Sequence, residues 1–334
     1  MSSKRVLLPQ AIESEAVDLL KAADCEIVLS PDTDPATVFP LLKDVQAIIL
    51  RTGINITREL LGHAASLDIV SRTGAGLDNV DLEAATQKGV IVTSNLGINT
   101  GSVVEHVLSL MLALFKQLPL LDKAVRSHNF SIRYQYLSGE LKNKTLGVVG
   151  FGRIGSELGR VCHQLFHMRV LAYDPYLTND HKKAYHSWVN FIDKNDLFAQ
   201  ADVVSIHIPL SEDTHHTVGA RELSLMKPEA FLINTSRGAV VDESALIKVL
   251  DAKKIAGAGL DVFEKEPVEE DNPLLNLDNV ILTPHSAALT KECVVNMAVE
   301  AAKCVLDVFN GKEPPNVANR EVLSSDRWRH LSRA

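Results

Sequence analysis

The sequence has few cysteines, and their spacing does not suit disulfides or metal sites. The 334-residue chain holds four, Cys25, Cys162, Cys293 and Cys304, with no CxxC pair among them. Cys293 and Cys304 fall in one expected helix, about 16 Å apart at the usual rise per residue, which is too far for a disulfide. We therefore expect a reducing, cytoplasmic compartment and no metal site.

An excess of positive charge is also missing, as is any long apolar run. Lysine and arginine number 34 against 42 acidic residues, so the net charge is −8. A nucleic-acid or anionic-membrane partner needs a basic face, so neither is expected. The longest apolar run, residues 107–115 with Ser109 inside it, is far shorter than the roughly 20 residues that span a bilayer. Lys4 and Arg5 precede only three apolar residues before Pro9, so no secretory signal is expected.

The composition is that of a globular protein with two domains. Apolar residues make up 46% and charged residues 23%, a balance typical of chains with packed cores. A length of 334 residues exceeds one ordinary domain of roughly 150 residues. Short, mostly continuous apolar runs alternate with helical patterns, which is typical of parallel strands covered on both faces. The expected strands are residues 5–8, 26–29, 47–50, 68–71, 90–93, 146–150, 169–173, 202–207, 231–234, 258–262 and 280–283.

Two long helices divide this α/β pattern into two doubly wound, Rossmann-like domains. The first is expected from about Thr100 to Val125 and is apolar nearly all round, which is typical of a helix buried between layers, domains or subunits. The second is expected from about Thr290 to Phe309. We interpret both as crossings between domains, so that a domain of residues 100–287 is inserted in a domain of residues 1–99 and 288–334.

A glycine-rich turn is the strongest local signal. The segment Gly150-Phe-Gly152-Arg-Ile-Gly155 follows an expected strand and precedes a helical pattern. Gly150 would make the tight turn, Gly152 would let the backbone approach a pyrophosphate, and Gly155 would let the helix pack on the strand. The free N–H groups of the helix N-terminus attract phosphate oxygens. Glycines also serve plain turns, but strand, turn and helix occur here in the order of a dinucleotide site.

Asp174 supplies a second feature of such a site. It ends the next strand, about 20 residues beyond the glycines, where a carboxylate accepts hydrogen bonds from both adenosine ribose hydroxyls. A carboxylate there would repel a 2′-phosphate, so NAD is expected over NADP. Lys182 and Lys183 follow closely, but solvated surface charge is the simpler interpretation of both.

Three side chains that can bind a substrate or exchange a proton follow consecutive apolar strands. They are Arg237, Glu266 and His285. Ligands in open α/β sheets bind beyond the carboxyl ends of the strands, so the three are expected to meet where the dinucleotide binds. A guanidinium grips a carboxylate through its planar fork. Imidazole titrates near neutrality and exchanges a proton with a carbonyl or hydroxyl oxygen. A carboxylate orients the ring and favours its charged form. The set suits hydride transfer at a 2-hydroxy or 2-oxo acid, although other glutamates between residues 264 and 270 compete with Glu266 on spacing.

A second glycine pair, Gly74 and Gly76, follows the expected strand at residues 68–71. Such a pair turns consecutive N–H groups, including that of Ala75, toward an anion, although a simple strand-to-helix turn explains the pair equally well. Arg51 and Arg72 also follow strands. Either would suit a distal anion or an ordinary salt bridge.

Taken together, these motifs resemble those of the D-isomer-specific 2-hydroxyacid dehydrogenases, over nearly the whole chain. The resemblance rests on the glycine motif with Asp174, on INTSRGAVVD at 233–242, on LDVFEKEP at 260–267 and on TPH at 283–285. It implies that residues 100–287 form an NAD-binding Rossmann domain and the rest a flavodoxin-like substrate-binding domain, with the active site in the cleft between them. It also implies that Arg237 binds the substrate carboxylate, His285 is the acid/base and Glu266 is its partner.

The resemblance further implies the binding contacts and the assembly. The family is usually dimeric, so a homodimer is expected, with the helix near residues 100–125 in its interface. The expected substrate contacts are Arg51, Arg72, Ala75, Gly76 and Arg237. The expected NAD contacts are Gly150, Gly152, Arg153, Ile154, Gly155, Asp174, Ile208, Pro209, Thr235, Ser236, Asp261 and Ser286.

Within the family the chain is most similar to the 3-phosphoglycerate dehydrogenases, on residues 72–81 and on Arg51, which matches a family arginine near the substrate phosphate. SNL at 94–96 replaces the usual Asn-Thr-Pro at the hinge, and Val104 stands where a small residue is common. The chain ends without an added regulatory domain, so control by serine is not expected.

The expected activity is NAD-dependent hydride transfer at C2 of a D-2-hydroxy or 2-oxo acid, and the resemblance points to 3-phosphoglycerate as the substrate. Reduction of hydroxypyruvate, glyoxylate or another 2-oxo acid remains open, as does oxidation of a simpler anion such as formate or phosphite. An NADH-sensing binding protein, like the related corepressors, is the alternative from another class. The intact set of arginine, glutamate and histidine argues against it, since a sensor needs no acid/base.

Overall fold

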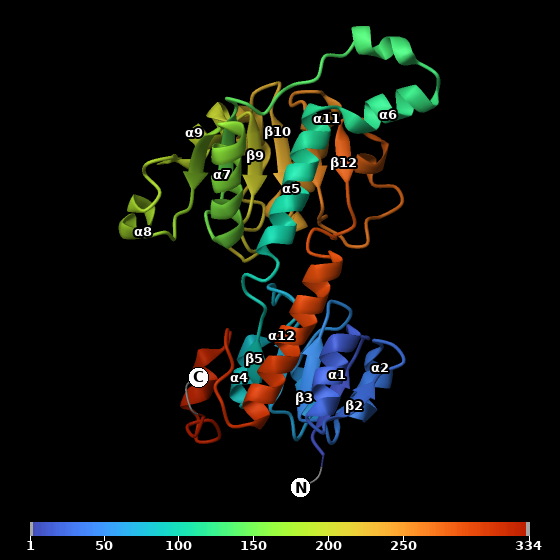
Figure 1. The fold of residues 1–334 in the computed structure, drawn as a ribbon, viewed down its shortest axis with the longest axis vertical. Helices are drawn as coiled ribbons and strands as arrows, with labels where there is room; N and C mark the ends of the chain where they lie inside the picture. The colour runs from blue at the N-terminus through green and yellow to red at the C-terminus, as the bar shows by residue number, and fades with distance from the viewer. Residues whose placement is uncertain (1–2, 332–334) are drawn as a thin grey trace. The chain divides into compact units, whose positions relative to one another are not determined.

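The computed structural model describes residues 3–331 and contains two parallel β-sheets in two compact units (Figure 1). Unit 1 is Met1–Asn99 with Leu289–Ala334, and unit 2 is Thr100–Ala288. Both units have the α/β architecture expected from the alternation of apolar runs and helical patterns. The expectation of two doubly wound, Rossmann-like folds is confirmed.

Unit 1 has a five-stranded sheet in the order β2-β1-β3-β4-β5. The order reverses between β1 and β3, and ligands of such sheets bind at the carboxyl ends of the strands near this point. The strands are β1 (Arg5–Leu8), β2 (Glu26–Leu29), β3 (Ala47–Leu50), β4 (Ile69–Arg72) and β5 (Ile91–Thr93). The helices are α1 (Ser14–Ala22), α2 (Pro35–Val38), α3 (Arg58–His63), α4 (Leu82–Gln87) and α12 (Lys291–Phe309), with 3-10 helices η1 (Phe39–Leu42) and η5 (Arg320–Ser324).

Unit 2 has a seven-stranded sheet in the order β12-β11-β10-β9-β6-β7-β8, which reverses between β6 and β9. The strands are β6 (Thr145–Val149), β7 (Arg169–Tyr173), β8 (Val189–Phe191), β9 (Val203–Ile206), β10 (Phe231–Asn234), β11 (Gly257–Leu260) and β12 (Val280–Leu282). The helices are α5 (Thr100–Phe115), α6 (Leu118–Arg126), α7 (Arg153–Phe166), α8 (Asn179–Lys183), α9 (Lys194–Gln200), α10 (Ala220–Leu225) and α11 (Glu243–Asp251), with 3-10 helices η2 (Phe130–Tyr134), η3 (Gly238–Val240) and η4 (Pro273–Asn276).

Each sheet is buried on both faces. In β6, Val148 and Val149 are both buried but belong to different hydrophobic clusters, and in β3 the same holds for Ile48 and Ile49. Neighbouring residues of a strand point to opposite faces, so each sheet separates two cores. This arrangement explains the continuous apolar runs in the sequence.

The prediction of one continuous helix from Thr100 to Val125 is wrong. The chain forms α5 and α6 at an angle of 59°. Gln117 between them has a left-handed φ of 52°, and Pro119 has no N–H to continue the helical hydrogen bonds. α5 is largely buried, whereas α6 buries only Ala124. Among residues 3–331 no single helix is long and apolar enough to cross a membrane. The bent pair of α5 and α6 together has the length and composition of a membrane span, but length and composition alone are weak evidence for one.

The short strand β8 was not expected from the sequence, because its three residues include the exposed Asn190 at the edge of the sheet. The other strands lie where they were expected, to within a few residues at their ends. The second long helix begins one residue late, at Lys291, because Thr290 is its N-cap and accepts a hydrogen bond from the Cys293 N–H at 3.1 Å.

Candidate active site

The predicted acid/base and its partner lie side by side in unit 2. His285 Nδ1 is 2.8 Å from Glu266 Oε2, and Glu266 Oε1 accepts a hydrogen bond from the Phe263 N–H at 3.1 Å. His285 follows β12 and Glu266 follows β11, two neighbouring parallel strands. Both side chains are partly exposed, at 42% and 38%. The imidazole is therefore oriented through Nδ1 while the pair stays accessible to a ligand.

The surroundings of Glu266 keep its carboxylate charged. Burial raises the pKa of Glu266. The hydrogen bonds from His285 and the Phe263 N–H, with the charges of His285 and Arg237, outweigh burial and bring the pKa below its ordinary value. A charged carboxylate accepts the hydrogen bond from Nδ1–H, which leaves Nε2 of His285 as the ring atom for proton exchange.

His285 lies in a strained turn that Asp261 holds in place. Its φ is +50°, in the left-handed region that non-glycine residues seldom adopt. The His285 N–H donates to the main-chain oxygen of Asp261 at 2.7 Å. The fully buried Asp261 carboxylate accepts from the N–H groups of Ser286 and Ala287, both at 2.9 Å, and from the Thr283 hydroxyl at 2.6 Å. One aspartate thus holds the backbone of His285 and of the two residues after it, and it also holds the Thr283 side chain before it.

Arg237 lies in a second turn, after β10. The buried side chain of Asn234 donates to the Arg237 main-chain oxygen at 2.9 Å and accepts from the Ser236 N–H at 3.0 Å and hydroxyl at 2.8 Å. A Cβ at Gly238 would lie 1.9 Å from the Phe263 main chain, so only glycine allows this approach. The contact brings the Arg237 turn against the segment that leads to Glu266. The charge of Arg237 lowers the pKa of that carboxyl group.

The glycine motif has the geometry that a dinucleotide needs. Gly150 has a φ of +90°, and a Cβ at Gly155 would lie 2.1 Å from the Gly150 main-chain oxygen. Both positions therefore require glycine. A Cβ at Gly152 would meet nothing within 4 Å, so the space before the N-terminus of α7 is open. α7 begins at Arg153 and Ile154, and its first N–H groups point to this space. These residues fit the pyrophosphate of NAD.

Other predicted cofactor residues lie at the same carboxyl edge of the sheet. Asp174 follows β7 and accepts hydrogen bonds from the N–H groups of Phe151, Tyr176 and Leu177 at 2.9 to 3.2 Å, which fixes it beside the glycine turn. Ile208 follows β9, and its side chain lies against Gly150. Pro209, next to it, is exposed.

Thr235 and Ser236 follow β10 at this edge. The Thr235 hydroxyl is buried and has no hydrogen-bond partner within residues 3–331. A buried polar atom without a partner is costly, so this hydroxyl fits a polar group of a bound cofactor. The Ser236 hydroxyl donates a hydrogen bond to the Asn234 side-chain oxygen, and the Ser286 N–H donates one to the Asp261 carboxylate.

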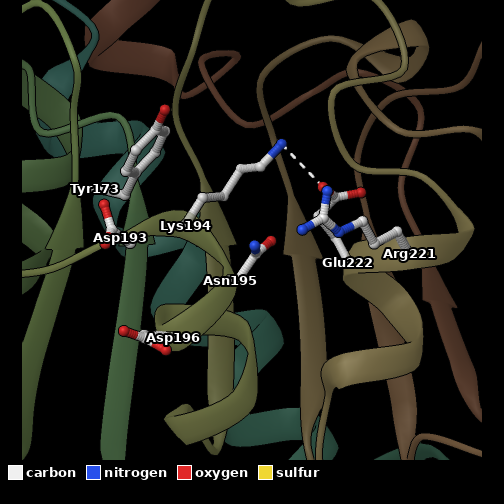
Figure 2. A pocket seen from close by; sticks show the side chains of 7 residues that line it. All are labelled: Tyr173, Asp193, Lys194, Asn195, Asp196, Arg221 and Glu222. Atoms are coloured by element: carbon white, nitrogen blue, oxygen red, sulfur yellow. Dashed lines mark ion pairs between the residues drawn. The ribbon is translucent and has the colours of Figure 1, made fainter.

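Two hollows adjoin the end of β7. One, of about 430 Å³, is lined by Asp174, the predicted ribose contact, with Lys182 and neighbouring residues. The other, of about 380 Å³, lies between α9 and α10 (Figure 2). In it Lys194 Nζ reaches Glu222 Oε1 at 3.0 Å. Because that cation and that acid neutralise each other, we interpret the second hollow as structural.

The predicted substrate residues of unit 1 gather at the ends of β3 and β4. Arg51 Nη1 donates to the Ala11 main-chain oxygen at 3.1 Å and lies 3.4 Å from Glu13 Oε1. Arg72 is buried, and its Nε donates to the Gly76 main-chain oxygen at 3.0 Å. Ala75 lies in the turn that this bond closes. Arg51 and Arg72 both have partners within unit 1.

Sequence reasoning missed two residues that hold the turns of Arg237 and His285 in place. Asn234 and Thr283 stand inside the quoted motifs, but nothing in their spacing distinguishes a holding role from a binding one. A signal did exist for Asn234, since an amide that ends a buried strand needs hydrogen-bond partners.

Comparison with known proteins agrees with this geometry. A family model described as "D-isomer specific 2-hydroxyacid dehydrogenase, NAD binding domain" matches residues 108–287. The chain is 36% identical over 315 residues to a D-3-phosphoglycerate dehydrogenase of Archaeoglobus fulgidus, covering 94% of this chain and 59% of the relative. It is 36% identical over 329 residues to a glyoxylate reductase of Thermococcus litoralis, covering 96% and 98%. The chain spans only 57% to 61% of the length of three such phosphoglycerate dehydrogenases.

Solved structures show the same likeness. The TT0316 protein from Thermus thermophilus has a TM-score of 0.86 at 31% identity, covering 94% of this chain and 99% of that one. A D-lactate dehydrogenase from Aquifex aeolicus, complexed with NAD and lactic acid, has a TM-score of 0.82 at 32% identity, covering 92% and 96%. The chain belongs to the D-isomer specific 2-hydroxyacid dehydrogenase family, and residues 108–287 are its NAD-binding domain.

Proposed function

We propose that the protein is an NAD-dependent oxidoreductase that transfers a hydride between nicotinamide and C2 of a D-2-hydroxy acid or the matching 2-oxo acid. The observation that carries the proposal is the pair of His285 and Glu266, 2.8 Å apart. The pair lies at the same carboxyl edge of one parallel sheet as the glycine turn. Bound NADH supplies the hydride, and bound NAD accepts it in the reverse direction.

Separate side chains bind the substrate, transfer the proton and orient the imidazole. Arg237 binds the carboxylate through its planar fork and draws electron density from the neighbouring carbonyl. His285 gives its Nε2 proton to the carbonyl oxygen during reduction and takes the hydroxyl proton in oxidation. Glu266 holds the ring through Nδ1 and stabilises the charged imidazolium. In unit 1, Ala75 and Gly76 lie in a turn that the Arg72 Nε–H holds closed through the Gly76 main-chain oxygen, and main-chain N–H groups of such a turn suit an anion.

For the substrate we propose a small 2-oxo acid of the glyoxylate or hydroxypyruvate type. Arg51, the residue suited to a distal phosphate, lies 3.4 Å from the Glu13 carboxylate. A phosphate dianion placed there would meet that like charge. The glyoxylate reductase relatives also match over nearly their whole length. Reduction of 3-phosphohydroxypyruvate is the second candidate, favoured by the presence of Arg51 and by the phosphoglycerate dehydrogenase relatives.

We also propose a homodimer formed through the segment from α6 to residue 137. This segment projects from the layers of unit 2 (Figure 1). Contiguous exposed apolar side chains mark interaction surfaces, and a second copy of the chain is the partner that the family resemblance implies. The most exposed apolar side chains here are Leu118, Val125, Phe130, Tyr134 and Leu137. Light scattering after chromatography should give twice the chain mass, and Leu137→Asp should shift it toward the monomer.

A substrate panel tests the activity. The full chain is mixed with NADH and glyoxylate, hydroxypyruvate, 3-phosphohydroxypyruvate or a branched 2-oxo acid, and loss of the reduced-nicotinamide absorbance is followed. We expect turnover, and we expect glyoxylate or hydroxypyruvate to exceed the phosphorylated acid in kcat/KM. Tight NADH binding without turnover of any acid would contradict the proposal and support a nucleotide sensor.

A further inference from the structure

A chain of hydrogen bonds links helix α5 to the turn that carries His285. His106, on α5, has Nε2 3.0 Å from the Thr283 hydroxyl oxygen and 3.5 Å from Asp261 Oδ1. The Thr283 hydroxyl donates to Asp261 Oδ1 at 2.6 Å. The main-chain oxygen of Asp261 then accepts from the His285 N–H at 2.7 Å. All of these residues lie in unit 2, where His106 and Thr283 are partly buried and Asp261 is fully buried.

The donor count fixes which ring nitrogen of His106 carries a proton. A threonine hydroxyl has one proton, and Thr283 uses it on Asp261. The Asp261 carboxylate is an acceptor, because the N–H groups of Ser286 and Ala287 point at its two oxygens. The Thr283 oxygen is therefore left as an acceptor toward His106, so Nε2 of His106 must be the protonated atom.

We propose that His106 is a positioning residue for His285, acting through Thr283 and Asp261. This inference rests on the proposed function. The His285 backbone is in the left-handed region, and such conformations persist only where the surrounding structure holds them. His106 supplies the donor that holds the Thr283 hydroxyl in its direction toward Asp261. Without that donor the turn relaxes, and the imidazole shifts relative to Glu266 and the substrate.

The test replaces each link with a variant that keeps its size. His106→Phe keeps a ring but removes the donor, and Thr283→Val keeps the branched shape but removes the hydroxyl. We expect each to lower kcat about 10-fold with little change in the NADH Kd, because small misplacements of a catalytic group cost rate more than binding. His106→Gln and Thr283→Ser, which restore a donor or a hydroxyl, should recover most of kcat.

The control is His163→Phe on α7. Like His106, His163 is a partly buried helical histidine, but it stacks on Trp188 and contacts the Met168 main-chain oxygen. This variant should keep wild-type kcat. The double variant of His106→Phe and Thr283→Val should lose little more than either single variant, since one network is broken once. The proposal would be overturned if the kcat losses of the two single variants multiplied in the double variant. It would also be overturned if His106→Phe left kcat unchanged, or if that variant lost NADH binding and kept kcat.

A second measurement does not depend on turnover. In protein labelled with ¹⁵N at histidine, the proton of the neutral His106 ring should be found on Nε2, and the His285 ring signals should move in His106→Phe but not in His163→Phe. An unprotonated His106 Nε2, or unmoved His285 signals, would overturn the proposal. If wild type reduces none of the acids while these signals behave as expected, the proposed function fails and the positioning network stands.

Discussion

Glu266 and His285 are 19 residues apart in the chain and 2.8 Å apart in the structure, joined through Oε2 and Nδ1. The pair lies on loops after neighbouring parallel strands, so the sheet register sets its spacing. The same contact lowers the pKa of Glu266 against the opposing effect of burial. A contact that orients the acid/base therefore also contributes to stability, and the contribution depends on pH.

The first prediction concerns that dependence. Because the pKa of Glu266 is lower in the folded protein than its ordinary 4.5, its charged form stabilises the fold above that value. The stabilisation disappears as the pH falls through the lowered pKa. In urea unfolding, Glu266→Gln should be less stable than wild type at about pH 6, and the difference should shrink at about pH 3. Glu269→Gln, at an exposed glutamate paired with Lys265, is the control. A gap that stayed constant with pH would contradict the linkage.

The contacts of the glutamates show what sequence spacing cannot decide. Glu264 stands only two residues before Glu266, yet its Oε1 lies 2.6 Å from His216 Nε2 and accepts from the Glu243 N–H. Glu266 alone of the two faces His285. Which glutamate meets the imidazole depends on the path of the loop after β11, and the chain sets that path through contacts with distant residues such as Gly238.

The apolar pattern of the sequence predicts the strands that are buried on both faces. The apolar run at residues 47–50, and the run at 231–233 with Asn234 at its end, form strands with the expected bounds, because both faces of each sheet are covered. The break at Gln117 was missed, since the apolar pattern of α5 suggested continuation past Pro119. The link from His106 to Thr283 spans 177 residues, and no periodicity along the chain marks it.

Replacement of Arg237 tests the carboxylate fork. Arg237→Lys keeps the charge but not the planar pair of donors, so kcat/KM should fall about 100-fold. The NADH Kd should change little. The matched control is Arg221→Lys on the exposed face of α10, which should retain wild-type rates. Near-full turnover in the Arg237 variant would remove this residue from the catalytic set.

Cofactor choice should depend on the charge of Asp174. Three main-chain N–H groups fix its carboxylate beside the glycine turn, where it would repel a 2′-phosphate. In Asp174→Asn the ratio of kcat/KM for NADPH over NADH should rise about 10-fold, since the repulsion is gone while the amide oxygen still accepts. Asp180→Asn, at an exposed position paired with Lys183, should leave the ratio unchanged. An unchanged ratio in both variants would mean that the ribose lies elsewhere.

Substrate choice should depend on the pairing of Arg51 with Glu13. Glu13→Gln removes the charge 3.4 Å from the guanidinium and leaves Arg51 better able to receive a phosphate. The kcat/KM for 3-phosphohydroxypyruvate should then rise several-fold relative to glyoxylate. Glu15→Gln, on the first turn of α1, provides the control. Equal changes for both substrates would show that Arg51 does not meet the distal group.

The ion pair of Lys194 and Glu222 should matter for stability and not for catalysis. The Glu222 side chain is 10% exposed, and it accepts from Lys194 at 3.0 Å and from the Gly219 N–H at 3.1 Å (Figure 2). Burial raises the pKa of Glu222, and the contacts with Lys194 and the Gly219 N–H outweigh it and lower the pKa. Lys194→Met would leave the Glu222 charge without its cation, and because the pair lines a solvent-accessible hollow we expect a loss of about 1 to 3 kcal/mol of unfolding free energy.

The double variant of Lys194→Met and Glu222→Gln distinguishes two causes of lost stability. One is the Glu222 charge left without a cation, and the other is the packing lost with the Lys194 side chain. Glutamine keeps an acceptor for the Gly219 N–H but carries no charge. The double variant should therefore unfold at a higher urea concentration than Lys194→Met alone. In both variants kcat and the NADH Kd should stay at wild-type values under conditions where the protein remains folded. A fall in NADH affinity that tracks the loss of Lys194 would instead place this hollow within the nucleotide site.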